Sequence, residues 1–111
     1  MTSEKAKRRW QRYDVKIPVK ISIGVDGKPL TFSGEASNVS IGGMALFTTR
    51  HLEPGTSLVM VLILPYSSEE LKLRGVVRNR NGFTHGIEFT HSTPLQERLI
   101  ELNCRAFALL E

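Results

Sequence analysis

The sequence contains few of the residues that mark several large classes of protein. Its 111 residues include a single cysteine, Cys104, so neither an internal disulfide nor a zinc site built from several cysteines can form. The longest apolar run, residues 58–64, is far shorter than the ~20 residues of a membrane-spanning helix. The basic residues near the N-terminus precede no apolar stretch, so we expect no secretory signal. These absences predict a small cytoplasmic protein that does not insert into membranes.

Charge is distributed unevenly along the chain. Residues 1–12 carry five basic side chains and one acidic side chain, which accounts for the whole net charge of +4. Residues 13–111 carry ten side chains of each sign. A neutral body with a cationic leader predicts an anionic partner at the N-terminal end. The length fits one domain, and we divide the chain into a basic arm, residues 1–12, and a folded body, residues 13–111.

The body shows the alternating hydrophobicity of β-strands. Apolar residues occupy the odd positions of segment 15–25, with mostly polar residues between them. Five further segments are typical of strands, at about residues 30–36, 44–49, 58–64, 71–80 and 83–90. Asp26-Gly27 and Asn81-Gly82 are strong turn signals. Six short strands at regular spacing predict an all-β domain, either a small antiparallel barrel or a sandwich.

One helix is predicted at the C-terminal end. Thr93-Pro94-Leu95-Gln96 offers an N-cap, a proline at the first helical position and a capping-box glutamine. An apolar stripe at helical spacing predicts the face that packs on the body, namely Leu95, Leu99, Leu102, Ala106 and Leu109. Cys104 lies roughly opposite this stripe, where we expect it to be partly exposed. Ile100 and Phe107 lie well round from the stripe, where they either widen the core contact or form a second apolar patch.

Two short motifs carry residue types suited to an anionic ligand. The first is Arg8-Arg9-Trp10-Gln11-Arg12, whose arginines offer planar donor forks for phosphate oxygens and for the O6/N7 edge of guanine. The second is Asn38-Val39-Ser40-Ile41-Gly42-Gly43, which combines an amide, a hydroxyl and a glycine pair that lets a ligand approach the backbone. Each motif also has a plainer interpretation, a solvated basic tail for the first and an ordinary turn for the second.

In this order and in this β-rich context, the two motifs resemble those of the PilZ domain family, R-x-x-x-R in an N-terminal loop followed by [D/N]-x-S-x-x-G. The resemblance extends over about residues 8–105. It implies a six-stranded antiparallel β-barrel with a C-terminal α-helix and a flexible N-terminal arm that folds over its ligand. The implied ligand is cyclic di-GMP. The residues that the resemblance places around it are Arg8, Arg9 and Arg12 from the arm, and Asn38, Ser40 and Gly43 on the barrel surface around one guanine.

The resulting hypothesis is a cyclic di-GMP receptor that is not an enzyme and needs no cofactor. Its signal passes to an unidentified downstream protein or to an equilibrium between monomer and homodimer. Two alternatives stay open, a nucleotide-independent protein–protein adaptor of the kind that the family includes in motility and type IV pilus function, and a small β-barrel that binds single-stranded RNA. The neutral body argues against an extended nucleic-acid track. His51, His85 and His91 lack the spacing of a metal motif, so we expect surface or structural roles for them.

Overall fold

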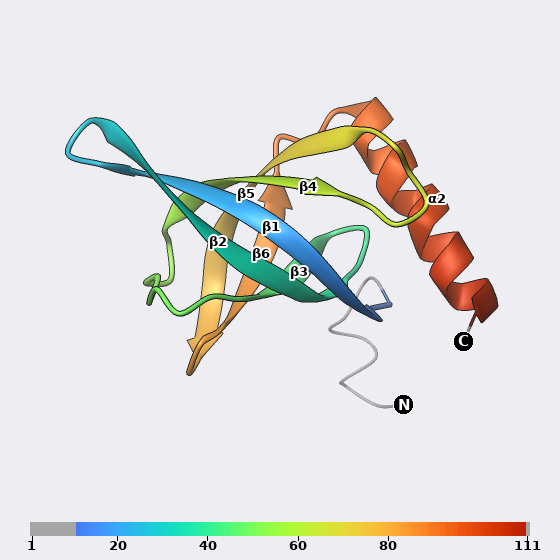
Figure 1. The fold of residues 1–111 in the computed structure, drawn as a ribbon, viewed down its shortest axis with the longest axis horizontal. Helices are drawn as coiled ribbons and strands as arrows, with labels where there is room; N and C mark the ends of the chain where they lie inside the picture. The colour runs from blue at the N-terminus through green and yellow to red at the C-terminus, as the bar shows by residue number, and fades with distance from the viewer. Residues whose placement is uncertain (1–10, 111) are drawn as a thin grey trace.

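The computed structural model describes residues 11–110 of the chain. Within this part, six strands form a closed antiparallel barrel in the order β1-β2-β3-β6-β5-β4, and one helix follows them (Figure 1). The elements are β1 (Tyr13–Val25), β2 (Lys28–Val39), β3 (Gly43–Phe47), β4 (Ser57–Ile63), β5 (Glu70–Asn81), β6 (Thr84–Thr90) and α2 (Pro94–Leu110). The predicted six-stranded antiparallel barrel and the C-terminal helix are confirmed, and of the two architectures that the strand pattern allows the structure has the barrel.

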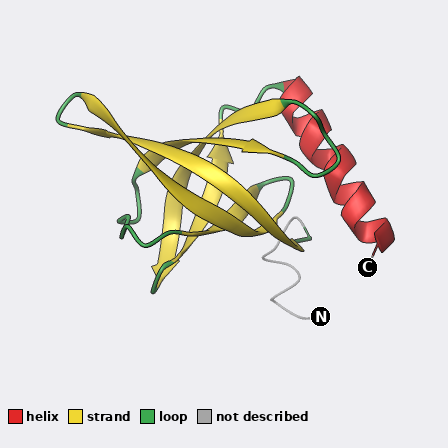
Figure 2. Ribbon diagram, viewed as in Figure 1, coloured by secondary structure: helices red, strands yellow, loops and turns green. Residues whose placement is uncertain are grey.

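Two tight hairpins set the register of the long strands. The β1–β2 hairpin turns at Asp26 and Gly27, whose φ angles of 52° and 78° suit a type I′ turn. The β5–β6 hairpin turns at Gly82 and Phe83, one residue later than the sequence predicts, because Asn81 still pairs with Thr84. The β1–β2 hairpin projects beyond the barrel (Figure 2). The β1–β4 ladder that closes the barrel is short, since it pairs only residues 20–22 with 59–61.

The barrel interior is filled by aliphatic side chains. Along β4 the even-numbered residues Leu58, Met60 and Leu62 are buried, while the odd-numbered residues face outward. The same alternation on β1 buries Ile17, Val19 and Ile21, which are three of the six apolar positions of the predicted pattern, while Val15 and Ile23 are half-buried and Val25 in the projecting hairpin is exposed. Because the interior is packed, the barrel offers its outer surface and its two ends to partners.

The N-terminal end of α2 forms as the sequence predicts. The Thr93 hydroxyl oxygen accepts a hydrogen bond from the Gln96 N–H at 3.1 Å. In return, the Gln96 side-chain oxygen accepts one from the Thr93 N–H at 3.0 Å. These reciprocal bonds are a capping box, which satisfies amides that the first helical turn leaves without partners.

The face of α2 that packs on the barrel differs from the predicted one. The buried helix residues are Ile100, Asn103, Cys104 and Phe107. The predicted contact residues Leu95, Leu102 and Leu109 are instead 66%, 43% and 86% exposed. That prediction was wrong, and so was the partial exposure of Cys104, which is only 4% exposed.

Specific tertiary contacts explain this rotation of the helix. The Phe107 ring packs against Tyr13 and Tyr66, with ring centroids 6.1 Å and 5.6 Å away. The buried Asn103 accepts a hydrogen bond from the Tyr66 N–H at 2.8 Å and donates one to the Leu99 carbonyl oxygen at 3.0 Å. The side of α2 that faces the barrel therefore carries an aromatic contact and an amide side chain whose hydrogen bonds are all made inside the protein. An apolar stripe in the sequence does not by itself determine which side of the helix is buried.

Candidate functional site

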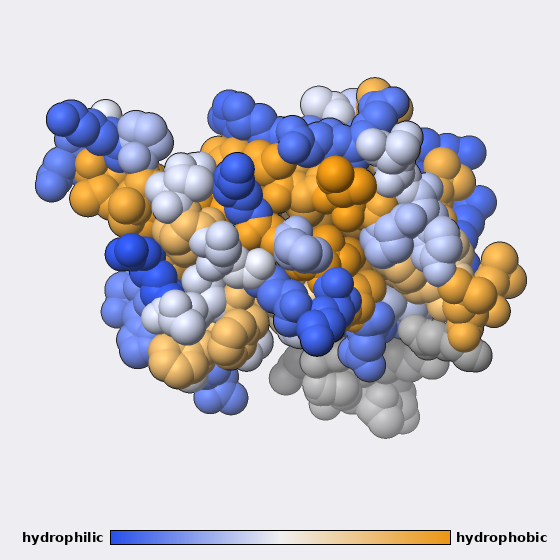
Figure 3. All heavy atoms as spheres, viewed as in Figure 1, coloured by the Kyte–Doolittle hydropathy of each residue, from blue (hydrophilic) through white to orange (hydrophobic). Residues whose placement is uncertain are grey.

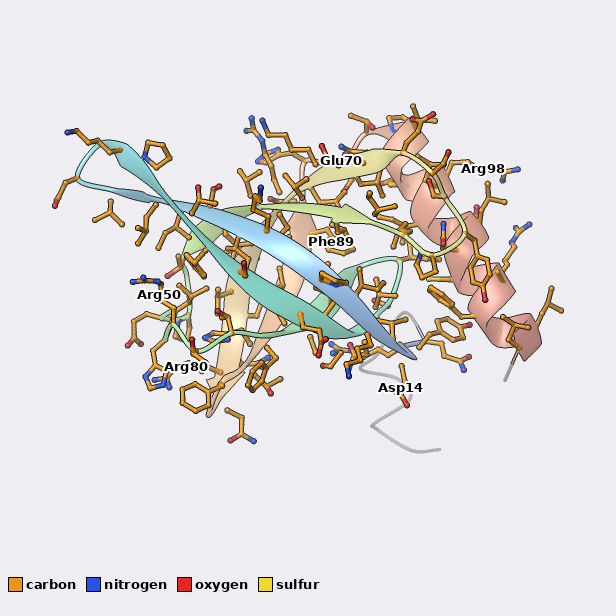
Figure 4. All side chains as sticks on the ribbon, in the orientation of Figure 1. Asp14, Arg50, Glu70, Arg80, Phe89 and Arg98 are labelled. Atoms are coloured by element: carbon orange, nitrogen blue, oxygen red, sulfur yellow. The ribbon has the colours of Figure 1, made fainter. Side chains whose placement is uncertain are left out.

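The antiparallel register brings Arg12, the last residue of the first motif, to the same end of the barrel as the second motif. Tyr13 pairs with Val39 and Asp14 pairs with Asn38, so the start of β1 lies beside the end of β2. Arg12, which is exposed and directly precedes β1, therefore lies next to the β2–β3 connection. Figure 4 shows Asp14 at the same end of β1, pointing away from the barrel. Of the predicted arginines, Arg8 and Arg9 lie outside the described residues.

Ser40 closes the turn between β2 and β3. Its hydroxyl oxygen accepts hydrogen bonds from the backbone N–H groups of Gly42 and Gly43, both at 3.2 Å. Its own N–H donates to the Gly43 carbonyl oxygen at 2.8 Å. The residue is only 5% exposed. The serine hydroxyl is thus committed to shaping the backbone of the turn, a role typical of serine in tight turns.

The glycine pair allows β6 to lie directly against the turn. Gly43 pairs with Glu88, and a Cβ atom at position 43 would overlap the backbone carbonyl oxygen of Ile87. The Gly42 carbonyl oxygen accepts a hydrogen bond from the Phe89 N–H at 3.0 Å. The close backbone contact leaves no room for a side chain at position 43.

Asn38 lies where the pairing of β2 with β3 shifts register, between Ala36 and Asn38. Its side-chain oxygen accepts a hydrogen bond from the Ala45 N–H at 3.1 Å, and the residue is half-buried. The side-chain oxygen thus satisfies a backbone amide of the neighbouring strand beside the register shift. An aspartate could accept the same bond, which accounts in physical terms for the [D/N] choice at this position.

A small cavity of about 190 Å³ lies between the chain entering β1, the motif turn and α2. Its lining comprises Gln11, Tyr13, Ile41, Glu101, Cys104, Arg105 and Ala108. Four of these residues lie on α2, and the sequence motifs include none of them: Glu101, Cys104, Arg105 and Ala108. No local pattern marks them, because their place beside the motif follows from the rotation of α2 that the sequence did not predict.

The cavity residue Cys104 has a protonated, buried thiol. Burial, and secondarily the negative charge of Glu101, raise the pKa of Cys104 from 9.0 to about 11. A thiol with so high a pKa is a poor nucleophile at neutral pH. Glu101 also faces Arg98 and Arg105 at 3.5 Å, in two loose ion pairs on the helix surface.

Other parts of the described chain have structural explanations. His85 is fully buried; its Nε2 accepts a hydrogen bond from the Leu52 N–H at 3.1 Å, so the ring ties a loop to the barrel. Among residues 11–110, no group of three or more histidine, cysteine or acidic side chains could hold a metal ion. No helix in that part of the chain is long and apolar enough to cross a membrane. A larger hollow of about 650 Å³, near Lys28, Arg74 and His91, is lined by none of the motif residues.

Solved structures with the same fold include several PilZ domains. The PilZ domain of CeSA from a cellulose-synthesizing bacterium is 24% identical, with a TM-score of 0.65 over 82% of this chain and 95% of that one. The YcgR domain from Escherichia coli, solved with c-di-GMP, is 14% identical, with a TM-score of 0.69 over 86% of each chain. The Bacillus subtilis inhibitor of motility MotI is 18% identical, with a TM-score of 0.76 over 94% of this chain and 52% of its own.

The sequence comparisons give one match. No curated protein sequence matched the chain. The family model of the PilZ domain matches residues 6–105, which includes both motifs and all six strands. With nearly its whole length matched, this chain belongs to the PilZ domain family.

Proposed function

We propose that this protein is a cytoplasmic receptor for cyclic di-GMP that acts without catalysis. The observation that carries the proposal is the β1–β2 register, which places Arg12 beside the turn of residues 40–42. The second arginine of the R-x-x-x-R motif therefore lies at the same end of the barrel as the Asn38–Gly43 motif. The c-di-GMP complexes of YcgR and of MrkH from K. pneumonia have the same fold and support this choice of ligand.

The two halves contribute differently to binding. Arg8, Arg9 and Arg12 supply charge-assisted hydrogen bonds to the phosphates and guanine edges of the ligand. Ser40 and Gly43 hold the turn in one shape, so that its backbone presents a fixed surface to a guanine. A preformed turn lowers the ordering cost of binding, because the backbone of the turn loses no further freedom when the ligand binds.

The signal leaves the protein as a conformational change that a downstream protein reads. Gln11 lies in the same cavity lining as Glu101 and Arg105, so the segment that enters β1 and the helix α2 share one surface. When Arg12 engages the ligand, the adjoining Gln11 shifts against this helix surface. A partner that contacts both segments distinguishes the free form from the bound form.

Isothermal titration calorimetry with cyclic di-GMP tests this proposal, with GMP as the control nucleotide. We expect binding at micromolar concentration or below with a defined stoichiometry, and no measurable heat from GMP, which lacks the second guanine and the closed ring. Circular dichroism on the same sample establishes that the barrel is folded. If the folded protein does not bind cyclic di-GMP, the proposal is wrong and the nucleotide-independent adaptor becomes the better account.

A further inference from the structure

A hollow of about 650 Å³ lies where the β1–β2 hairpin leaves the barrel, and none of the motif residues line it. The β1–β4 ladder pairs only residues 20–22 with 59–61, so beyond Ser22 the hairpin diverges from β4 and projects from the body (Figure 2). This hairpin hollow lies between residues 22–24 and 27–29 on one side and β4, β5 and the end of β6 on the other. Small-molecule sites typically have volumes of about 300–1,000 Å³, so the hairpin hollow has room for a ligand of that kind.

Two glycines leave the hairpin hollow unfilled by the protein's own side chains. Gly24 and Gly27 both line it, and a Cβ atom at either position meets nothing within 4 Å. The turn accounts for Gly27, whose φ is 78°, but Gly24 lies inside β1 and has no positive φ that requires glycine. A glycine in a strand interior lowers stability, and it often marks a position that a ligand approaches closely.

The apolar part of the lining is aliphatic. It comprises Ile23, Pro29, Leu58, Val59 and Val76. Figure 3 shows apolar residues along the projecting hairpin and at its base. No phenylalanine, tyrosine or tryptophan of residues 11–110 lines the hollow, so it lacks the large rings on which planar ligands stack. The lining therefore suits an aliphatic chain better than a nucleobase.

The strand register places a guanidinium on the same face as this aliphatic surface. Arg74 pairs with Val59 on β4 and with Thr90 on β6, and Val59 pairs in turn with Ser22 on β1. Directly paired residues of antiparallel strands point to the same face of a sheet. These four residues therefore form one row across four strands, and all of them line the hairpin hollow.

The acidic and basic side chains around the hollow are not balanced. Lys28 on the hairpin and Arg74 on β5 belong to the lining, whereas no acidic residue does. Within the described part of the chain, neither of them forms an ion pair. Glu88, the acidic residue of β6, is paired with Arg78 instead, and Asp26 is exposed at the hairpin turn outside the lining. Two cations beside an aliphatic surface favour a ligand with a negative charge.

We propose that the hairpin hollow binds a single-chain aliphatic anion, such as a medium-chain fatty acid. The chain covers the aliphatic lining, and the carboxylate or phosphate head lies at Lys28 and Arg74. A guanidinium donates paired hydrogen bonds to either head group, and these charge-assisted bonds fix the end of the chain. The site shares no residue with the family motif, so the proposal does not depend on cyclic di-GMP binding.

Nuclear magnetic resonance of the ¹⁵N-labelled full chain tests the site with decanoate, below its micelle-forming concentration. The amide signals of residues 22–24, 57–59 and 90–91 shift saturably, with a dissociation constant in the submillimolar range. Decylammonium binds at least tenfold more weakly, because its cationic head meets the two basic side chains. Acetate, which lacks the chain, is equally weak. Decyl phosphate shows which of the two anionic heads the site prefers.

Two variants examine the head and the chain separately. Arg74→Gln weakens decanoate binding at least tenfold, whereas Arg80→Gln, which removes another exposed arginine of β5 outside the lining, leaves it unchanged. Gly24→Leu places a side chain in the hollow and prevents binding. The same spectra show whether each variant is folded, and Arg74→Gln is sufficient if Gly24→Leu is not.

Three results overturn the proposal. The first is decanoate shifts that map outside the hairpin hollow, and the second is equal binding of decanoate and decylammonium. The third is no decanoate binding together with cosedimentation on phosphatidylglycerol vesicles, which would assign the basic residues to a membrane surface. Cyclic di-GMP affinity is measured separately on each variant, and it stays at the wild-type value because Arg12 and the motif turn are intact.

Discussion

The two halves of the family motif have different relations to the fold. Ser40 and Gly43 are buried, with the serine hydroxyl bonded to backbone amides and the glycine pressed against β6. Arg12, directly before β1, is exposed. The family motif thus combines residues that shape the backbone with an exposed arginine, and in the proposed function only the arginines contact the ligand through their side chains. Substitutions in the two halves should separate loss of stability from loss of binding.

The largest loss of stability is expected from Gly43→Ala. The added Cβ overlaps the backbone oxygen of Ile87, and backbone in a paired strand cannot move aside as the end of a side chain can. We expect a loss of about 3 kcal/mol or more in the free energy of unfolding, measured by urea denaturation. Gly24→Ala is the control, because a Cβ at Gly24 meets nothing within 4 Å. Equal stability of the two variants would contradict the structural role of Gly43.

Ser40→Ala should have the next largest effect. It removes the acceptor of two N–H groups in a buried turn, which costs about 1–3 kcal/mol of unfolding free energy. Ser37→Ala serves as the matched control, since exposed Ser37 makes a single long bond to Ala45 at 3.4 Å and should cost under about 0.5 kcal/mol. If Ser40→Ala unfolds with the same midpoint as the wild type in urea, the hydroxyl does not hold the turn.

A smaller, pH-dependent effect is expected from Cys104, on the helix beside the turn. The unfolded thiol loses its proton near pH 9, whereas burial keeps the folded thiol protonated up to its pKa of about 11. The free energy of unfolding should therefore fall as pH rises from 9 to 11. Below pH 9 the thiol is protonated in both states, so it causes no pH dependence there. Urea denaturation at several pH values measures how steeply the free energy of unfolding falls with pH. This fall should be less steep for Cys104→Ala, because the variant lacks the thiol. Identical slopes would show that the thiol is not shielded.

Much of the fold follows from local patterns in the sequence. The alternation on β1, the Asp26-Gly27 turn and the capping box at Thr93 each depend on neighbouring residues, and the structure confirms them. The rotation of α2 does not depend on local pattern, because the helix has two apolar sides. The choice between them rests on contacts of Phe107 and Asn103 with Tyr66, a residue from the β4–β5 connection.

The site divides in the same way. The motif residues can be found in the sequence, and the strand register explains why Arg12 lies beside the β2–β3 turn. Only the structure shows that the Ser40 hydroxyl bonds to the backbone of its own turn. Likewise, only the structure shows that Arg105 lines the cavity. Both depend on contacts between segments that are distant in the sequence or on backbone geometry that residue types alone do not specify.

Arg12→Ala should have the smallest effect on stability and a large effect on binding. Calorimetric titration with cyclic di-GMP, together with thermal unfolding of the same sample, tests the central claim most directly. We expect affinity to fall at least tenfold, through loss of charge-assisted hydrogen bonds, while unfolding free energy changes by less than about 0.5 kcal/mol. Arg80→Ala, which removes an exposed arginine of β5, should leave both values unchanged. Unaltered affinity in Arg12→Ala, or a loss of stability that accounts for the loss of binding, would contradict the division between scaffold and ligand contacts.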